Sequence, residues 1–338
     1  MEEENLYSRI QKIMTTSLAP KRLVDLIGDT PLVDVSTMVN DSVQLYAKCE
    51  FMNPGLSMKD RLINYILLEA EGKKDLQPGD TIICASSGNT GLSVAMLGAV
   101  KGYKVIVVTS EKCSSEKRDH IRAFNAKLLV VDEEEYMEYA GELAKKHGYF
   151  DINQYDNPDN PQAYYATLGP EIWRQSQGEV SCLVMTSSTF GCIGGTAGYL
   201  KEQNRDIHVV LADPLYSGVS DYYWQYKQRP FEKLSRKKYF IEGAGKATPS
   251  GCADFSLIDE VINVSDEEAV ACCHQLAQTE GLFVGGSSGL NLSACQKLSE
   301  RLDTGVIVTI LCDHGVKYLS KIYNPSFLQE QHIEVLNV

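Results

Sequence analysis

The sequence lacks the features that place a chain in or across a membrane. No run approaches the roughly 18 consecutive apolar residues that a transmembrane helix needs. The N-terminus, Met1-Glu2-Glu3-Glu4-Asn5, is acidic and does not have the basic-then-apolar order of a signal peptide. We therefore expect a cytoplasmic protein.

Basic residues are too few for a surface that binds nucleic acid or an anionic membrane. The chain has 32 Lys and Arg against 45 Asp and Glu, which gives a formal net charge of −13 at pH 7. Nucleic acids and anionic membranes both favour lysine and arginine, so neither is expected as a partner. A small anionic ligand held at a local site is not excluded by this charge.

The ten cysteines form no regular framework, and the C-x-x-C spacing of a zinc or redox site is absent. Cys84, Cys182 and Cys312 lie in apolar runs, whereas Cys272 and Cys273 lie in a helical pattern. This placement is typical of reduced, packed thiols in a cytosolic protein. No metal site is expected.

Apolar strands and amphipathic helices alternate along most of the 338 residues, and a loop rich in Asn and Pro at 153–161 separates two such blocks. This order predicts parallel sheets covered on both faces, in two α/β domains with a cleft between them. Residues 1–20 are expected to form a polar arm and 216–250 a less regular region. The expected strands are 81–85, 104–108, 127–131, 182–186, 208–212, 261–264 and 305–311, and the expected helices are 91–100, 115–124, 133–146, 163–177, 194–203, 266–279 and 287–298.

The stretch with the most chemical content is Asn53-Pro54-Gly55-Leu56-Ser57-Met58-Lys59-Asp60-Arg61. It follows an alternating apolar run at 44–48 and precedes a helical pattern, so Lys59 falls in the first turn of a helix. The helix dipole and the free N–H groups there disfavour an extra cation. An amine that is neutral near pH 7 is a nucleophile for carbonyl groups. The alternative is a solvated lysine paired with Asp60 on a surface helix.

Two loops after expected strands combine hydroxyl groups with glycine at a helix start. Ser86-Ser87-Gly88-Asn89-Thr90-Gly91 forms a cradle for a carboxylate or a phosphate, unless it is an ordinary N-cap with its turn glycines. Ser187-Ser188-Thr189-Phe190-Gly191-Cys192 has the form of a phosphate cup, although no P-loop lysine follows. Ligands of open α/β sheets bind at the carboxyl ends of strands, where both loops are expected.

A third loop, Gly285-Gly286-Ser287-Ser288-Gly289, matches the G-x-S-x-G nucleophile elbow of α/β-hydrolases between an apolar run and a helix. A triad would then combine Ser287 with Asp303 or Asp313 and with His314 or His332. That alternative leaves only 49 residues after Gly289 and gives no role to Lys59.

Pyridoxal 5'-phosphate is the one cofactor that requires all of these parts together. It forms an imine with a lysine, its phosphate binds at a helix N-terminus, and its ring nitrogen needs a partner. A serine hydroxyl as that partner, unlike an aspartate, leaves the ring nitrogen largely unprotonated. Elimination and replacement at Cβ are then favoured over transamination or racemisation.

From about residue 22 to about 325, the chain resembles the fold-type II pyridoxal-phosphate family of cysteine synthases and cystathionine β-synthases. The Lys59 stretch resembles the family's N-P-G-G-S-x-K-D-R, and Ser86–Gly91 resembles its T-S-G-N-T-G. The stretches 76–83 and 111–117 are similar to the cystathionine synthase branch. Gln154, in Asn153-Gln154-Tyr155, is similar to the family glutamine that helps to hold the substrate carboxylate.

The resemblance implies a role for each matching residue. Lys59 would carry the cofactor and later remove the substrate α-proton, Asn89 would bond the ring hydroxyl, and Ser287 would face the ring nitrogen. The α-carboxylate would bind to Ser86, Ser87, Asn89, Thr90 and Gln154, the phosphate to Ser188, Thr189, Phe190, Gly191 and Cys192, and the substrate face would include Gly243.

The resemblance also implies two three-layer αβα domains with the cofactor in the cleft between them. Residues 1–53 and 159–338 would form the large cofactor-binding domain, and residues 54–158 a smaller mobile domain that carries the carboxylate loop. A homodimer is the family expectation.

Four positions depart from the family pattern. Leu56 and Phe190 replace glycines, Ser86 replaces a threonine, and Cys192 replaces a threonine in the phosphate cup. Cys192 gives up a good hydroxyl donor, and Phe190 is expected to reshape the cleft. These changes are compatible with the cofactor, but they affect which substrate is expected.

The predicted function is β-replacement on serine, an activated serine or cysteine through an aminoacrylate intermediate, with a thiol or sulfide as the favoured nucleophile. The expected partners are small-molecule amino acids. The alternatives are an amine nucleophile, as in diaminopropionate-type synthases, or β-elimination that releases sulfide from cysteine. A protein of another class, a catalytically silent sensor or binding relative, is the remaining alternative.

Overall fold

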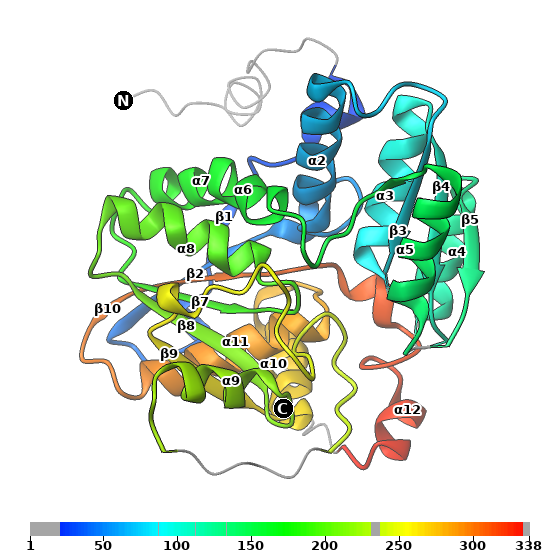
Figure 1. Ribbon diagram of the computed structural model, residues 1–338. Coiled ribbons are helices and arrows are strands. Elements are labelled where there is room, and N and C mark those ends of the chain that lie inside the picture. The colour runs from blue at the N-terminus through cyan, green and yellow to red at the C-terminus, as the bar shows by residue number, and fades with distance from the viewer. Residues whose placement is uncertain (1–20, 87, 112, 133, 231–236, 334–338) are drawn as a thin grey trace, which may run out of the picture.

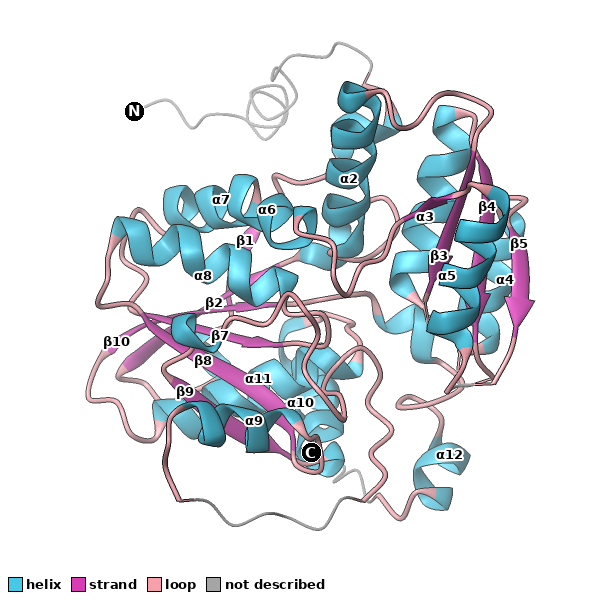
Figure 2. Ribbon diagram, viewed as in Figure 1, coloured by secondary structure: helices cyan, strands magenta, loops and turns pink. Residues whose placement is uncertain are grey.

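The computed structural model describes residues 21–86, 88–111, 113–132, 134–230 and 237–333. The expected arm at 1–20 therefore lies outside the described residues. Two separate sheets organise the chain, and helices pack on both faces of each (Figures 1 and 2). This arrangement confirms the predicted α/β fold with parallel-type sheets.

The larger sheet has six strands in the order β1-β2-β10-β7-β8-β9. All neighbouring strands in it run parallel except the pair β1 and β2, which is antiparallel. Its strands are β1 (Leu32–Asp34), β2 (Val43–Lys48), β7 (Cys182–Thr186), β8 (His208–Pro214), β9 (Glu260–Val264) and β10 (Gly305–Ile310).

The smaller sheet has four parallel strands in the order β5-β4-β3-β6. Its strands are β3 (Thr81–Ala85), β4 (Lys104–Thr109), β5 (Lys127–Val130) and β6 (Phe150–Asp151). All four lie inside 54–158, and the exact domain boundaries stay a prediction.

The described helices are α2 (Lys59–Lys73), α3 (Asn89–Lys101), α4 (Ser115–Ala123), α5 (Tyr136–His147), α6 (Asp159–Ala166), α7 (Leu168–Gln175), α8 (Gly191–Gln203), α9 (Val219–Tyr226), α10 (Asp266–Glu280), α11 (Gly286–Ser299) and α12 (Pro325–Glu330). None of these is long and apolar enough to cross a bilayer.

Alternate side chains of each buried strand enter different cores, because successive side chains of a strand point to opposite faces. In β7, Leu183 and Met185 join the core that includes α6, α7 and α8, whereas Val184 joins the core with α10 and α11. In the smaller sheet, Ile83 packs with α5 and Cys84 with α3. Each sheet is thus the middle of three layers.

The structure corrects one predicted helix. The helix expected at 163–177 is two helices, α6 and α7, which meet at Thr167 (φ −124°, ψ −65°). Pro170 has no N–H to donate to the carbonyl four residues earlier, and its ring collides with that carbonyl, so the helix breaks. The Thr167 hydroxyl instead donates to Ala163 O at 2.6 Å.

The region expected to be irregular, 216–250, contains the aromatic helix α9. Its V-S-D-Y-Y-W-Q-Y composition carries little of the periodic contrast between apolar and polar residues that predicts a helix.

The ten cysteines are all free, and nine of them are buried, which confirms the expected packed thiols.

Candidate active site

Lys59 is the first residue of α2, as predicted, and its side chain is half-buried. Its backbone N–H lies 3.4 Å from Ser57 Oγ, and within the part of the chain that the structure describes its ammonium has no hydrogen bond or ion pair. Burial lowers the pKa of Lys59, and the neighbouring Cys192, Cys312 and Asp313 oppose part of this shift. The site therefore holds an amine that is disposed to act as a nucleophile.

Asp60 does not pair with Lys59, so the surface-helix alternative is wrong. The Asp60 carboxylate is fully buried and accepts the N–H of Gly55 and the hydroxyl of Ser93, each at 2.5 Å. Leu56 follows Gly55 in the turn before α2. Its φ is +59°, a conformation that favours glycine. This backbone conformation explains why the family pattern has a glycine at that position.

Arg61 anchors the start of α2 to the turn after β2 and to α7. Its guanidinium forms ion pairs of 2.7 Å with both Glu50 and Glu171, and Lys48 pairs with Glu171 at 2.6 Å. Burial alone would raise the pKa of Glu171, but the hydrogen bonds and charges of Arg61 and Lys48 hold it at about 2. These contacts fix the helix that carries Lys59.

The predicted carboxylate residues Thr90 and Gln154 meet although they are 64 positions apart. The Thr90 hydroxyl donates to Gln154 Oε1 at 2.6 Å, and Gln154 Nε2 donates to Ala85 O at 3.1 Å. Ser86 Oγ accepts the N–H of Gly91 at 2.9 Å and so shapes the turn. Ser87 lies outside the described residues.

Asn89 is held by two buried charged residues that the sequence did not single out as its partners. Its Nδ2 donates to Asp313 Oδ2 at 2.7 Å, and its Oδ1 accepts from Lys317 Nζ at 2.8 Å. Lys317 also donates to the carbonyls of Gly55 and Leu56, at 2.9 and 3.1 Å. Lys317 therefore ties Asn89 to the turn before Lys59. The only sequence signal for Asp313 and Lys317 was their position after an expected strand, 305–311.

The predicted phosphate cup precedes α8. The Phe190 N–H donates to Ser187 Oγ at 2.8 Å, and α8 begins at Gly191. A Cβ at Gly191 would collide with the Asn160 side chain, whose Nδ2 donates to Thr189 Oγ1 at 3.1 Å. Free N–H groups at the start of a helix of this length favour a phosphate group.

The two departures in the cup have structural explanations. Phe190 has φ +62°, which explains the glycine of the family pattern, and its ring packs in the core 5.6 Å from that of Phe255. Phe190 was expected to reshape the cleft, but its side chain is instead buried in the core. Burial raises the pKa of the Cys192 thiol well above its ordinary value, so this residue adds no negative charge beside a phosphate.

Ser287 lies in the first turn of α11 and is buried. Its hydroxyl opposes part of the rise that burial causes in the pKa of the Cys312 thiol, and the same thiol affects the pKa of Lys59. The context of the hydrolase alternative is absent, because Val284 forms only an isolated bridge with His314 rather than a strand. Among the described side chains, no histidine is hydrogen-bonded to Ser287.

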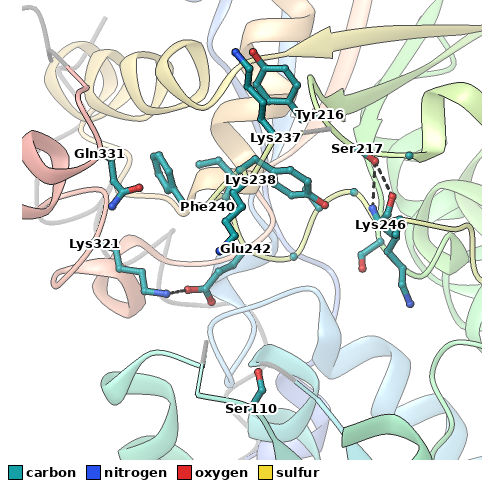
Figure 3. A pocket seen from close by; sticks show the side chains of 18 of the residues that line it. Ser110, Tyr216, Ser217, Lys237, Lys238, Phe240, Glu242, Lys246, Lys321 and Gln331 are labelled. Atoms are coloured by element: carbon teal, nitrogen blue, oxygen red, sulfur yellow. Dashed lines mark hydrogen bonds and ion pairs between the residues drawn. The ribbon is translucent and has the colours of Figure 1, made fainter. Parts of the chain in front are cut away.

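A cavity of about 650 Å³ lies between the two three-layer units (Figure 3). Ser110, after β4, lines it from the smaller unit, and Ser188 and Gly243 line it from the larger one. Two predicted contact residues therefore face one cavity. No group of three or more His, Cys, Asp or Glu side chains arranged for a metal ion occurs among the described residues.

These residues fit pyridoxal phosphate. They provide an amine that forms no ion pair with a described residue, free N–H groups at the start of α8, and a buried serine hydroxyl at the start of α11. The roles of the individual residues stay predictions.

Comparisons with known proteins agree with this fit. The family model described as pyridoxal-phosphate dependent enzyme matches residues 23–313. Cysteine synthase B of Pseudomonas aeruginosa is 36% identical over 310 residues, covering 90% of this chain and 97% of that protein. Cystathionine beta-synthase of Apis mellifera is 34% identical over 319 residues, covering 91% of this chain and 62% of that protein. The crystal structure of O-ureido-L-serine synthase superposes with a TM-score of 0.83 at 30% identity, covering 91% of this chain and 96% of that one.

Proposed function

Because the chain belongs to the pyridoxal-phosphate dependent enzyme family, we propose that it catalyses β-replacement on serine, an activated serine or cysteine, with a thiol or sulfide as nucleophile. The observation that carries this proposal is Lys59, an amine of lowered pKa at the start of α2 and close to Cys192 of the expected phosphate cup. The relatives named cysteine synthase and cystathionine beta-synthase support the reaction class.

When bound, pyridoxal phosphate supplies an aldehyde for the lysine amine and withdraws electrons from Cα of the amino acid. We assign its phosphate to Ser188–Cys192, its ring hydroxyl to Asn89 and its ring nitrogen to Ser287. A neutral hydroxyl at that nitrogen favours chemistry at Cβ, as expected from the sequence.

The remaining steps belong to the chain's own residues. Lys59 Nζ takes the α-proton and returns a proton to Cα after the new bond to Cβ has formed. Burial lowers the pKa of this amine, which favours the neutral form that accepts a proton. Thr90 and Gln154, already bonded to each other at 2.6 Å, hold the α-carboxylate together with Ser86 and Ser87. In the net reaction the bond between Cβ and the leaving group breaks and a bond between sulfur and Cβ forms.

The two units provide the setting for this chemistry. We propose that residues 54–158 move as a smaller domain that closes the 86–91 loop over the substrate. We further propose a cytoplasmic homodimer that acts on small-molecule amino acids. The free cysteines support a reducing compartment.

The similarity to O-ureido-L-serine synthase supports a second candidate, in which the nucleophile is not sulfur. The same fold and the same lysine would serve an oxygen or amine nucleophile. Product identification by mass spectrometry, with sulfide, homocysteine, a hydroxyl compound and an amine offered in turn, distinguishes the two candidates.

The test is an absorbance spectrum of the purified, cofactor-loaded protein, alone and then with serine, O-acetylserine, O-phosphoserine and cysteine. We expect a visible band that Lys59→Ala removes and that at least one of these amino acids converts to a new band. Lys73→Ala is the control, because Lys73 is on the same helix and its side chain is 55% exposed. A protein that shows no visible band after reconstitution contradicts the enzyme function and favours the silent relative.

A further inference from the structure

Lysine dominates the wall of the cavity on the side of the 237–247 segment. Lys237, Lys238, Lys246 and Lys321 all line the cavity, and Glu242 is the only carboxylate among the described lining residues (Figure 3). In a chain of net charge −13, this concentration of positive charge is local. A basic cavity raises the local concentration of anionic ligands.

Glu242 does not neutralise this wall, because its charge is already shared. Its carboxylate accepts from Lys117 Nζ at 2.6 Å and from Lys321. Burial alone would raise the pKa of Glu242, but Lys117 and Lys321 outweigh it and lower the pKa. Glu242 therefore stays ionised and committed to those two lysines.

The other three lysines form no ion pair with a carboxylate within the described parts of the chain. Burial lowers the pKa of Lys246, and the nearby Asp156 opposes part of this shift. Lys246 Nζ lies 3.7 Å from the centroid of the Tyr155 ring, and Lys237 Nζ lies 5.3 Å from that of Tyr216. Lys238 forms neither a hydrogen bond nor an ion pair with a described residue. Aromatic faces hold a cation in place without cancelling its charge.

The position of Lys246 relates this charge to the substrate. Tyr155, under Lys246, follows Gln154, which is the predicted contact of the α-carboxylate. Gly243, the predicted substrate-face residue, is three positions before Lys246, and Gly245 N–H donates to Ser187 O at 2.8 Å. Tyr155 and Gly243, which both line the cavity, therefore connect the lysine wall to the predicted substrate contacts.

We propose that the lysine wall recognises a phosphoryl group on the donor amino acid, so that the preferred donor is serine phosphorylated on its hydroxyl. This inference rests on the proposed β-replacement function. A phosphate monoester carries nearly two negative charges and three acceptor oxygens at neutral pH, and a lysine ammonium forms a charged hydrogen bond with such a group. Serine and O-acetylserine have no anionic group on the side chain and would leave these cations without a partner.

The test is a titration of the cofactor absorbance with each donor in turn, which reports binding rather than turnover. We expect the half-saturating concentration of O-phosphoserine to be at least about tenfold lower than that of O-acetylserine. Lys246→Gln is expected to raise it about tenfold or more for O-phosphoserine and less than about twofold for O-acetylserine, since a charged hydrogen bond is lost only in the first case. Lys246→Arg keeps the charge and is expected to recover most of the affinity.

Lys227→Gln is the matched control. Lys227 also lies over tyrosine rings, at 5.4 Å from that of Tyr223, but does not line the cavity. It is expected to leave both titrations unchanged.

Four results would overturn the inference. O-acetylserine or serine binding as tightly as O-phosphoserine excludes selection of a phosphoryl group. A loss of cofactor affinity in Lys246→Gln assigns Lys246 to the cofactor's phosphate, and a raised KM for the acceptor alone assigns it to the acceptor's carboxylate. An equal loss for all donors shows a structural role. If no donor changes the spectrum, the proposed function itself has failed, which is a distinct outcome.

Discussion

Lys317 and Asn89, 228 positions apart in the chain, are joined by a hydrogen bond of 2.8 Å from Nζ to Oδ1. The same ammonium also binds the carbonyls of Gly55 and Leu56, in the turn that leads to Lys59. One buried lysine therefore sets the relative position of two residues that we assign to the cofactor.

Lys317→Met is expected to lower the affinity for pyridoxal phosphate about tenfold, because Asn89 and the Leu56 turn lose their common donor. The Gly55 carbonyl and Asn89 Oδ1 would lose their donor, whereas the Leu56 carbonyl keeps the N–H of His314 at 3.2 Å. The free energy of unfolding is therefore expected to fall by about 1–3 kcal/mol. Cofactor titration by absorbance measures the first effect and denaturant unfolding the second. Lys317→Arg retains donors and charge. An unchanged cofactor affinity in Lys317→Met would show that Asn89 is positioned by Asp313 alone.

Alkaline pH provides a second test of Lys317. Burial lowers the pKa of Lys317 from 10.5 to about 8 in the folded protein. Between these two values the unfolded chain binds more protons at this residue than the folded chain does, so its contribution to stability rises with pH. The unfolding free energy of the wild type minus that of Lys317→Met is expected to rise by roughly 2–3 kcal/mol from pH 8 to pH 10.5. A difference that falls or stays flat over this range contradicts a lowered pKa.

Gly191→Ala is expected to weaken cofactor binding by at least about tenfold. The new Cβ would collide with the Asn160 side chain, and relief of that collision would shift the first N–H groups of α8. Gly194→Ala is the matched control, because a Cβ at Gly194 meets nothing within 4 Å. There the substitution is expected to raise the unfolding free energy by about 0.5–1 kcal/mol, as alanine favours helix over glycine. Equal effects of the two variants would argue against a phosphate at this helix start.

Lys117 joins the two units. It lies on α4 and donates to Glu242 Oε2 at 2.6 Å and to Tyr318 OH at 3.2 Å in the larger unit. Lys117→Met is expected to lower the free energy of unfolding by about 3 kcal/mol, because it removes one partner of a buried ion pair. The remaining ion pair of Glu242 with Lys321 limits the loss to this size. Lys73→Met, which breaks the exposed pair with Glu69, is expected to change it by less than about 0.5 kcal/mol. Denaturant unfolding of both variants measures the difference.

Local patterns predicted the framework well. Strands 81–85 and 182–186 agree with β3 and β7, because buried parallel strands are nearly continuous apolar runs between turns. Lys59 was placed correctly in the first turn of its helix, since a helix start follows from residues close together in the sequence. The resemblance in turn identified the family, because its motifs are long and occur in order.

What the sequence did not reveal depends on contacts between distant segments. Asp60 could equally have been a surface partner of Lys59, and only the fold brings Ser93 to it. The role of Lys317 depends on the approach of Asn89, and the basic wall of the cavity depends on how 237–246 folds back over Tyr155. None of these contacts leaves a periodic signal in the chain.

The strand order of the larger sheet has a consequence for biosynthesis. Strand β10, at Gly305–Ile310, lies between β2 and β7, and Asp313 and Lys317 follow it directly. A nascent chain cannot complete this sheet, or the Asn89 contact, until those late residues have left the ribosome. The smaller sheet, whose strands span residues 81–151, is free to form earlier. The emerging polypeptide therefore completes the larger sheet and the Asn89 contact only after residues 305–317 have been synthesised, when pairing between distant segments closes the fold.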